Sequence, residues 1–346
     1  MLTLNQATKE ARTTLKILVI FLGGLFSLII IVRGIFALKE IISPTPAPAP
    51  TVSFGVLPKI DFPQSTTQQK LTYSINTDSG NLPTFADRVI VNKMVGYPPD
   101  ILQVDDANNM ASSISFPVPG QSLSNINYRW ADNSSLQRQL TMNVDTKDFI
   151  MTSLFLNDPD VISANNLPGQ AGAATEAQSF LSTMSEYPTD IDPTLTTTTL
   201  FKIDNGALIP ATSLSNTQVI GVNFFQTDVN GLPIYYPNAL SSPMTVFVAG
   251  GQYQSQVVAA DFSHQYVSTV SATYPIKTPA QAFDDLKAGN AFISYYNGGG
   301  NIQITNVFLA YYIGDEKQNY LFPIVVFQGS NFYAYVPAIL DGWVEK

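Results

Sequence analysis

The chain has 346 residues, of which 45% are hydrophobic and 12% charged, with 26 acidic and 17 basic side chains, one histidine and no cysteine. The missing cysteines exclude disulfides, thiolate metal sites, iron–sulfur clusters and thiol nucleophiles, and the single histidine excludes any site that needs two. The net charge of −9 argues against general nucleic-acid binding, which needs a clustered basic surface.

An apolar segment near the N-terminus predicts a membrane anchor. Ile17 to Leu38 covers 22 residues with one charge, Arg33. At about 1.5 Å rise per residue, that length crosses a hydrocarbon layer roughly 30 Å thick. The alternative is a cleavable signal peptide ending at Ala47-Pro48-Ala49, but Pro50 follows directly and should obstruct cleavage. We therefore predict a retained transmembrane helix at residues 17–38.

The residues around this span predict its orientation. Lys9, Arg12 and Lys16 precede it, and fewer basic residues follow it closely, which favours a cytoplasmic N-terminus. No second apolar run long enough to cross a membrane follows the span. We therefore expect a single-pass protein of the cell membrane, with a cytoplasmic tail at residues 1–16 and a large extracytoplasmic C-terminal region.

A proline-rich stretch follows the span. In Ser43 to Pro50 every second residue is proline, which removes main-chain donors and favours an extended polyproline II conformation. We interpret residues 39–70 as a Pro/Ala-rich stalk. A ligand for an SH3 or WW groove is the alternative interpretation of such a stretch.

Short strand signals and Asn-Gly turns dominate the rest of the chain. Leu140, Met142 and Val144 alternate with polar residues, which is typical of a half-buried strand. Asn205-Gly206 and Asn230-Gly231 are preferred two-residue hairpin turns. The predicted hairpins and strand pairs are 201–211, 219–236, and 311–313 with 320–327 and 332–336.

Three segments carry helical patterns. Thr278 begins the best-specified one, because Thr-Pro-Ala-Gln supplies an N-cap, a proline at the first position and a capping-box glutamine, and Gly289 ends it. Apolar residues recur at helical spacing over 170–186. A third, weaker pattern covers 104–113.

Two strand groups share a local pattern that suggests an internal repeat. Phe224-Phe225 precedes Leu232-Pro233-Ile234, and Tyr311-Tyr312 precedes Leu321-Phe322-Pro323-Ile324. Coincidence among aromatic strands that end at a proline is the alternative. A repeat predicts an α+β fold of tandem units, each an antiparallel sheet covered by one helix. The regions expected after the stalk are a β-rich region at 71–160, a first helix-plus-sheet unit at 161–250 and a second at 251–346.

The arrangement of one span, an external region and a final helix followed by an aromatic strand and a Pro-containing strand pair resembles bacterial YycH/YycI-type regulators and PepSY-like modules. The segments that carry the resemblance are 278–288, 306–313 and 320–337, mainly within residues 278–337, with a looser similarity over 170–236. The resemblance implies an extracytoplasmic module that binds or restrains a membrane partner, often a sensor kinase. It transfers no binding residue.

The search for catalytic chemistry finds little. His264 lies in a strand-like run, and we interpret it as structural, since no Ser-His-Asp arrangement is indicated. Gly298-Gly299-Gly300 lacks the Lys-Ser or Lys-Thr of a phosphate loop. The aspartate pairs are the only catalytic or metal-binding candidates, but sequence adjacency does not place two carboxyl groups across a cleft. These pairs are Asp105/Asp106, Asp158/Asp160, Asp190/Asp192 and Asp284/Asp285, and those at 158/160 and 190/192 keep calcium open as an alternative.

Aromatic residues are the best candidates for a binding face. Neighbouring strand residues point to opposite faces, so one member of each aromatic pair should face a helix and the other solvent or a partner. Core packing is the alternative. The candidate binding-face residues are Tyr295, Tyr311, Tyr312, Tyr333 and Tyr335.

The sequence thus predicts a membrane-anchored extracytoplasmic module that acts by protein–protein recognition at the cell envelope and is not an enzyme. We expect no cofactor, no metal and no nucleic acid, and an envelope protein or sensor kinase as partner. The oligomeric state stays open. The alternatives are a cell-wall polysaccharide-binding protein, a carboxylate-dependent glycan hydrolase and a structural spacer.

Overall fold

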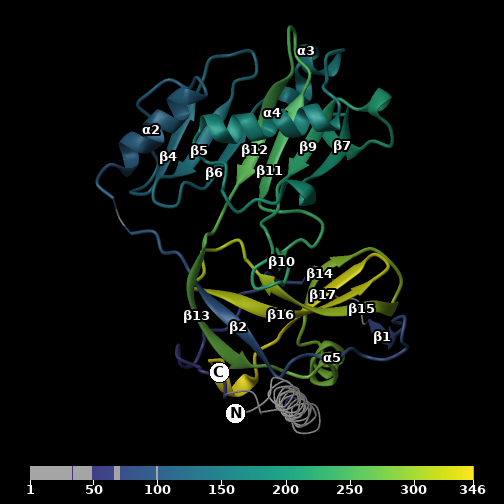
Figure 1. Cartoon of the computed structure of the whole chain (residues 1–346). Coiled ribbons are helices and arrows are strands. Elements are labelled where there is room, and N and C mark those ends of the chain that lie inside the picture. The colour runs from purple at the N-terminus through teal and green to yellow at the C-terminus, as the bar shows by residue number, and fades with distance from the viewer. Residues whose placement is uncertain (1–32, 34–48, 66–70, 99, 346) are drawn as a thin grey trace, which may run out of the picture. The chain divides into compact units, whose positions relative to one another are not determined.

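The computed structural model describes residues 33, 49–65, 71–98 and 100–345 (Figure 1). The described residues from Pro50 onward form one compact unit. The predicted cytoplasmic tail and nearly all of the predicted span at 17–38 lie outside the described residues. Among the residues that are described, no helix is long and apolar enough to cross a membrane.

The predicted stalk ends earlier than residue 70. Residues 50–65 belong to the compact unit, and Leu57 is 0% exposed within its core. Phe54, Ile60 and Phe62 are partly buried against the same clusters. The prediction failed here because these apolar residues are separated by prolines and polar residues, a pattern that is typical of a linker.

Most of the unit consists of two sheets, with few helices, so the α+β class is confirmed. The first sheet has nine antiparallel strands (Figure 1). In spatial order they are β3 (Gln121–Ser122), β4 (Asn127–Ala131), β5 (Gln139–Asn143), β6 (Phe149–Thr152), β12 (Gln256–Phe262), β11 (Met244–Ala249), β9 (Val219–Asn223), β7 (Thr197–Asp204) and β8 (Ala207–Pro210).

The second sheet has eight strands, built around a long antiparallel pair. Its main path is β1 (Thr72–Ile75), β15 (Asn301–Tyr312), β16 (Tyr320–Gly329), β17 (Phe332–Pro337) and β14 (Phe292–Tyr296). Beside this path, β2 (Arg88–Met94) pairs with both β16 and β13 (Val267–Pro275), and β10 (Ile234–Tyr235) pairs in parallel with β15.

The two sheets are interleaved along the chain. The nine-stranded sheet takes strands from all three predicted regions, 71–160, 161–250 and 251–346, and the chain changes sheet after β2, β9, β10 and β12. The connector from β12 to β13, residues 263–266, is therefore one of the places where the chain passes between the sheets.

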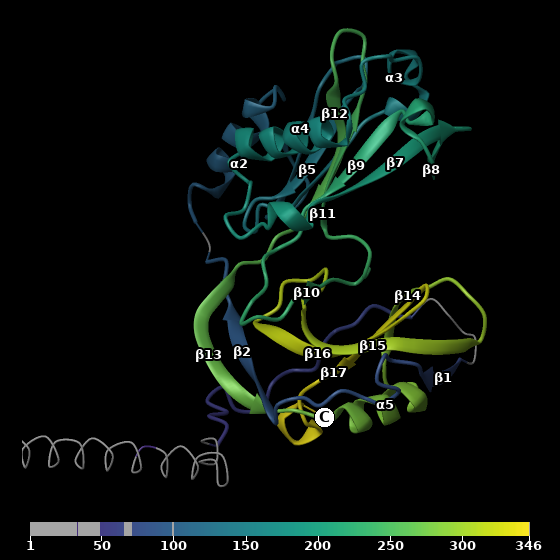
Figure 2. The same ribbon diagram turned by 45° about the vertical axis from the view of Figure 1, so that its right-hand side comes forward.

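All three predicted helices are present. Helix α2 (Gln103–Ser113) and helix α4 (Gln170–Thr183) lie on one face of the nine-stranded sheet, and α5 (Pro279–Ala288) packs on β17 of the other (Figure 2). Helix α5 has the predicted capping box between Thr278 and Gln281, and Gly289 ends it with φ of 85°. The shorter helical turns are η1 (Phe155–Asn157), α3 (Pro159–Ile162), η2 (Pro193–Leu195), η3 (Leu214–Asn216) and η4 (Asp341–Trp343).

The hairpin predictions have mixed outcomes. Asn205-Gly206 joins β7 and β8 as predicted, and β15, β16 and β17 pair in the predicted order. Asn230-Gly231 also forms a tight turn, with φ of 52° and 76°. The hairpin predicted over 219–236 is wrong, however, because β9 and β10 belong to different sheets. A turn fixes only its own few residues, and β10 pairs with β15 instead.

Candidate functional site

The structure places most of the predicted aromatic face inside the protein. Tyr311 and Tyr335 are 0% exposed and Tyr312 is 1% exposed, whereas Tyr295 and Tyr333 are half-buried. Tyr311 belongs to the main core, and Tyr312 belongs to a cluster on the opposite face that Phe62 covers. Three of the five tyrosines are thus closed to a partner because both faces of this sheet are covered. A binding role for Tyr295 and Tyr333 stays a prediction.

Two of these buried tyrosines differ in hydrogen bonding, which gives a matched prediction. The Tyr312 hydroxyl has no partner among the described residues, whereas the Tyr335 hydroxyl accepts from Ser294 at 2.9 Å and donates to the Tyr236 carbonyl at 3.1 Å. Because an unpaired buried hydroxyl is unfavourable, we expect Tyr312→Phe to raise the free energy of unfolding by about 1 kcal/mol. Tyr335→Phe should lower it by about 1–2 kcal/mol. Urea unfolding of both variants beside the parent protein checks the opposite signs.

The aspartates of the predicted pairs occupy separate places, and several have structural partners there. Asp158 caps α3 and Asp192 caps η2, while Asp105 and Asp106 lie in the first turn of α2. Asp284 binds Lys287, and Asp285 binds Lys277. No described group of three or more carboxylate or histidine side chains has the arrangement of a metal site.

His264 is buried and hydrogen-bonded to Asp190. Its Nε2 lies 2.8 Å from Oδ1 of Asp190, and its side chain is 4% exposed. Burial alone would raise the pKa of Asp190, but hydrogen bonds from His264 and Gln226 outweigh it and lower that pKa. A ring this buried is poorly placed to reach a substrate, so the geometry favours a structural role for His264.

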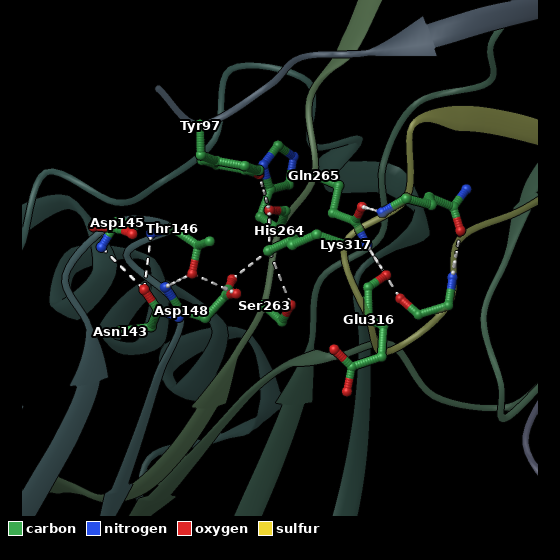
Figure 3. A network of polar contacts seen from close by, with 12 residues as sticks. Tyr97, Asn143, Asp145, Thr146, Asp148, Ser263, His264, Gln265, Glu316 and Lys317 are labelled. Carbon is green, nitrogen blue, oxygen red and sulfur yellow. Dashed lines mark hydrogen bonds and ion pairs between the residues drawn. The ribbon is translucent and has the colours of Figure 1, made fainter. Parts of the chain in front are cut away.

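A polar network surrounds this histidine on the connector between the sheets (Figure 3). Lys317, on the loop between β15 and β16, donates to Oδ1 of Asp148 at 2.6 Å and to the His264 carbonyl at 2.9 Å. Tyr97 donates to the same carbonyl at 2.9 Å. Lys317, on a loop of the eight-stranded sheet, thereby binds both the connector at residues 263–266 and Asp148 in the turn after β5.

Gln265, next to His264 on the connector, binds the same loop that carries Lys317. Its side-chain amide donates to the carbonyls of Gly314 and Glu316 at 3.1 and 3.2 Å and accepts from the Gln318 main chain at 3.0 Å. Gln265 is 2% exposed. Because the buried Gln265 amide forms all these hydrogen bonds, it holds the connector against the loop between β15 and β16. We therefore interpret residues 263–266 as a rigid joint. We call the contacts of Lys317, His264 and Gln265 the junction network.

Titratable groups beside the junction network are perturbed by burial. Burial raises the pKa of Glu186 to about 7, with Lys147 opposing and Asp148 adding to the shift. Burial lowers the pKa of Lys317, against the effect of Asp148. Burial also raises the pKa of Asp261, where the charge of Asp315 adds to the shift. Such groups make the junction sensitive to pH.

The largest hollow among the four described lies elsewhere, beside an extended segment that precedes β1. We call Pro58–Pro63 the strap. A cavity of about 560 Å³ lies between the strap, α5 and the last residues described, and a smaller one of about 210 Å³ lies between the strap and the loop that carries Lys317. Sequence reasoning missed this site. The only signal was an alternation of apolar residues at Pro58, Ile60 and Phe62, hidden within the predicted stalk.

Comparisons with known proteins give distant likenesses. No family model and no curated protein match the chain. An uncharacterized protein from Eubacterium rectale is 14% identical with a TM-score of 0.41, covering 78% of this chain and 88% of that one. The C-terminal domain of Bacillus megaterium YpeB is 12% identical with a TM-score of 0.33, covering 73% and 97%. At these TM-scores neither likeness extends to function.

Proposed function

We propose that the chain is a membrane-anchored extracytoplasmic module that recognises a protein partner at the cell envelope and performs no chemistry. In this proposal residues 17–38 are the anchor and the compact unit from Pro50 carries the binding site. The observation that supports it most is the cavity of about 560 Å³ beside the strap. Concave, largely apolar sites with a few polar groups are where proteins bind ligands.

Two further features support recognition rather than catalysis. Most of the candidate catalytic groups are engaged elsewhere, since His264 is buried against Asp190, Asp158 and Asp192 cap helical turns, and Asp284 and Asp285 bind lysines. The predicted span at residues 17–38 is the second feature, because an anchor would place the protein in the same membrane as an integral membrane partner such as a sensor kinase.

Photocrosslinking in membranes tests the proposal. The full-length protein carries benzoylphenylalanine either at Lys59 of the strap or, as a control, at Tyr253, which is 87% exposed between β11 and β12. We expect illumination to give a discrete adduct with one envelope protein from position 59 and none from position 253. The absence of an adduct at position 59, or the same adducts from both positions, would sink the proposal.

A second candidate function is glycan binding on the nine-stranded sheet. A groove of about 330 Å³ there is lined by Phe201 and Phe247, whose ring centroids lie 6.1 Å apart, together with Asn223, Thr245 and Asp261. Aromatic faces beside amide, hydroxyl and carboxyl groups suit a sugar ring. If this candidate is right, purified wall glycan should retain the parent protein but not Phe247→Ala, and release of sugars that stops in Asp261→Asn would indicate hydrolysis.

A further inference from the structure

The strap has the form of a strand but lacks the pairing of one. Lys59 and Asp61 are exposed while Ile60 and Phe62 are half-buried, which is the alternation of an extended segment. The Phe62 ring stacks on Phe292 with centroids 5.2 Å apart. Among the residues that the structure describes, none forms a main-chain hydrogen bond with residues 59–62. Side-chain packing therefore holds the strap in place, and the main-chain groups of residues 59–62 have no main-chain partner among the described residues.

Main-chain hydrogen bonds to the segment 343–345 are present at Leu57, just before the strap. The Leu57 amide donates to the Trp343 carbonyl at 2.9 Å, and the Glu345 amide donates to the Leu57 carbonyl at 2.8 Å. In an extended chain every second residue presents its main-chain groups to the same edge. Lys59 and Asp61 thus face the same edge as Leu57.

The cavity of about 560 Å³ lies at this edge. It is lined by Pro58, Lys59 and Ile60 of the strap and by Val344 and Glu345, next to the bridge that Leu57 forms with Val344. An unpaired strand edge beside a hollow is a template for another extended chain.

The walls of this cavity indicate which side chains it would accept. The apolar lining includes Phe322, Pro323, Pro337 and Ile339. The charged lining has three carboxylates, Asp285, Asp341 and Glu345, against the two ammonium groups of Lys59 and Lys277.

Lys277 is already paired within this cavity. Its Nζ lies 2.8 Å from Asp285 and 2.9 Å from Asp341. The Asp341 side chain is 89% exposed, so it can also face an incoming cation. The excess of carboxylates favours a ligand with basic groups and disfavours an anionic one.

From these observations we infer that the strap edge is a strand-addition site for an extended peptide that alternates apolar and basic side chains. The main chain of the peptide pairs with Lys59, its apolar side chains pack on Phe322 and Ile339, and its basic side chains face Asp341 and Glu345. This inference rests on the proposed function, because it specifies how the partner is bound.

Peptide binding to the full-length protein in detergent micelles tests the inference. The probe is a fluorescent, end-blocked heptapeptide that alternates valine and lysine, measured by anisotropy. Two control peptides of the same sequence, the N-methylated twins, carry main-chain N-methyl groups, one on its lysines and the other on its valines. Each therefore lacks the main-chain donors along one edge of the extended peptide. A third twin replaces lysine by glutamate. We expect at least one N-methylated twin and the glutamate twin to bind about tenfold or more weakly than the probe, as the loss of one or two main-chain hydrogen bonds or of charge complementarity implies.

Variants of Lys59 test the same contact from the side of the protein. Lys59→Pro removes one main-chain donor, whereas Lys59→Ala removes the same charge and keeps that donor. We expect Lys59→Pro to weaken probe binding about tenfold and Lys59→Ala to leave it within about threefold. Equal thermal unfolding midpoints for the two variants show that the difference does not come from misfolding.

Two results would overturn the inference. Strand addition is wrong if the probe and both N-methylated twins bind the parent protein equally well and the probe also binds Lys59→Pro as well as the parent protein. If the probe does not bind the parent protein at all, the assigned peptide chemistry is wrong. In either case a crosslinked partner at position 59 would leave the proposed function standing, because that experiment does not depend on the mode of binding.

Discussion

Replacing Lys317 by methionine is expected to lower the free energy of unfolding by about 3 kcal/mol. The change keeps most of the apolar stem but leaves Asp148 and the His264 carbonyl without the ammonium group that binds them at 2.6 and 2.9 Å. Both members of the ion pair are largely buried, since the Lys317 and Asp148 side chains are 24% and 26% exposed. Removing one partner from such a pair leaves the other charge poorly solvated. Urea unfolding followed by tryptophan fluorescence measures the loss.

Lys287→Met is the matched control for this variant. Lys287 also pairs with an aspartate, Asp284 at 2.8 Å, but their side chains are 48% and 73% exposed. Exposed pairs contribute little, so the expected change is below about 0.5 kcal/mol. Equal effects of the two substitutions would contradict the role given to the junction network.

Stability is expected to fall as pH rises from 5 to 8, and Glu186 is the cause. Burial raises the pKa of Glu186 in the folded protein to about 7, from an ordinary value of 4.5. The folded chain therefore binds more protons than the unfolded chain between these two values. The stabilisation is fully present below about pH 4.5 and is lost as pH rises through about 7. After allowance for partial exposure of the side chain, we expect about 2 kcal/mol between pH 5 and pH 8.

Glu186→Gln should remove this dependence. The glutamine amide does not titrate. The free energy of unfolding of the variant should therefore change by about 2 kcal/mol less than that of the parent protein over the same pH range. The control Glu345→Gln removes an exposed carboxylate and should keep the parent slope. Stability that rises from pH 5 to pH 8 in the parent protein, or a Glu186→Gln variant with an unchanged slope, would show that Glu186 is not the group responsible.

The helices and local turns were predictable because their signals are local. The capping box at Thr278 and the stop at Gly289 act within one helical turn, and the structure has both. Asn205-Gly206 and Asn230-Gly231 likewise set φ at their own positions.

Strand partners were less predictable, because pairing depends on residues far apart in the chain. β10 pairs with β15, and β2 pairs with β13, across long separations that no local pattern encodes. The aromatic pair Tyr311-Tyr312 shows the consequence. Its alternation correctly implied opposite faces, but whether both faces are covered depends on Phe62 and on other distant segments.

The candidate site was hidden for the same reason. Pro58 and Pro63 made the strap resemble a linker, and Lys277 gave no sign that Asp285 and Asp341 would flank it. The charges of the junction network are equally dispersed, since Asp148, His264 and Lys317 meet only after folding.

Amide hydrogen exchange on the full-length protein tests most directly whether the strap is the binding site. In the free protein we expect the Leu57 amide, which is bonded to Trp343, to be protected, and the amides of residues 59–62 to exchange rapidly. With the alternating valine–lysine peptide bound, exchange at Lys59 should slow about tenfold or more. Strap amides already protected in the free protein, or unchanged when the peptide is bound, would contradict a binding site at the strap.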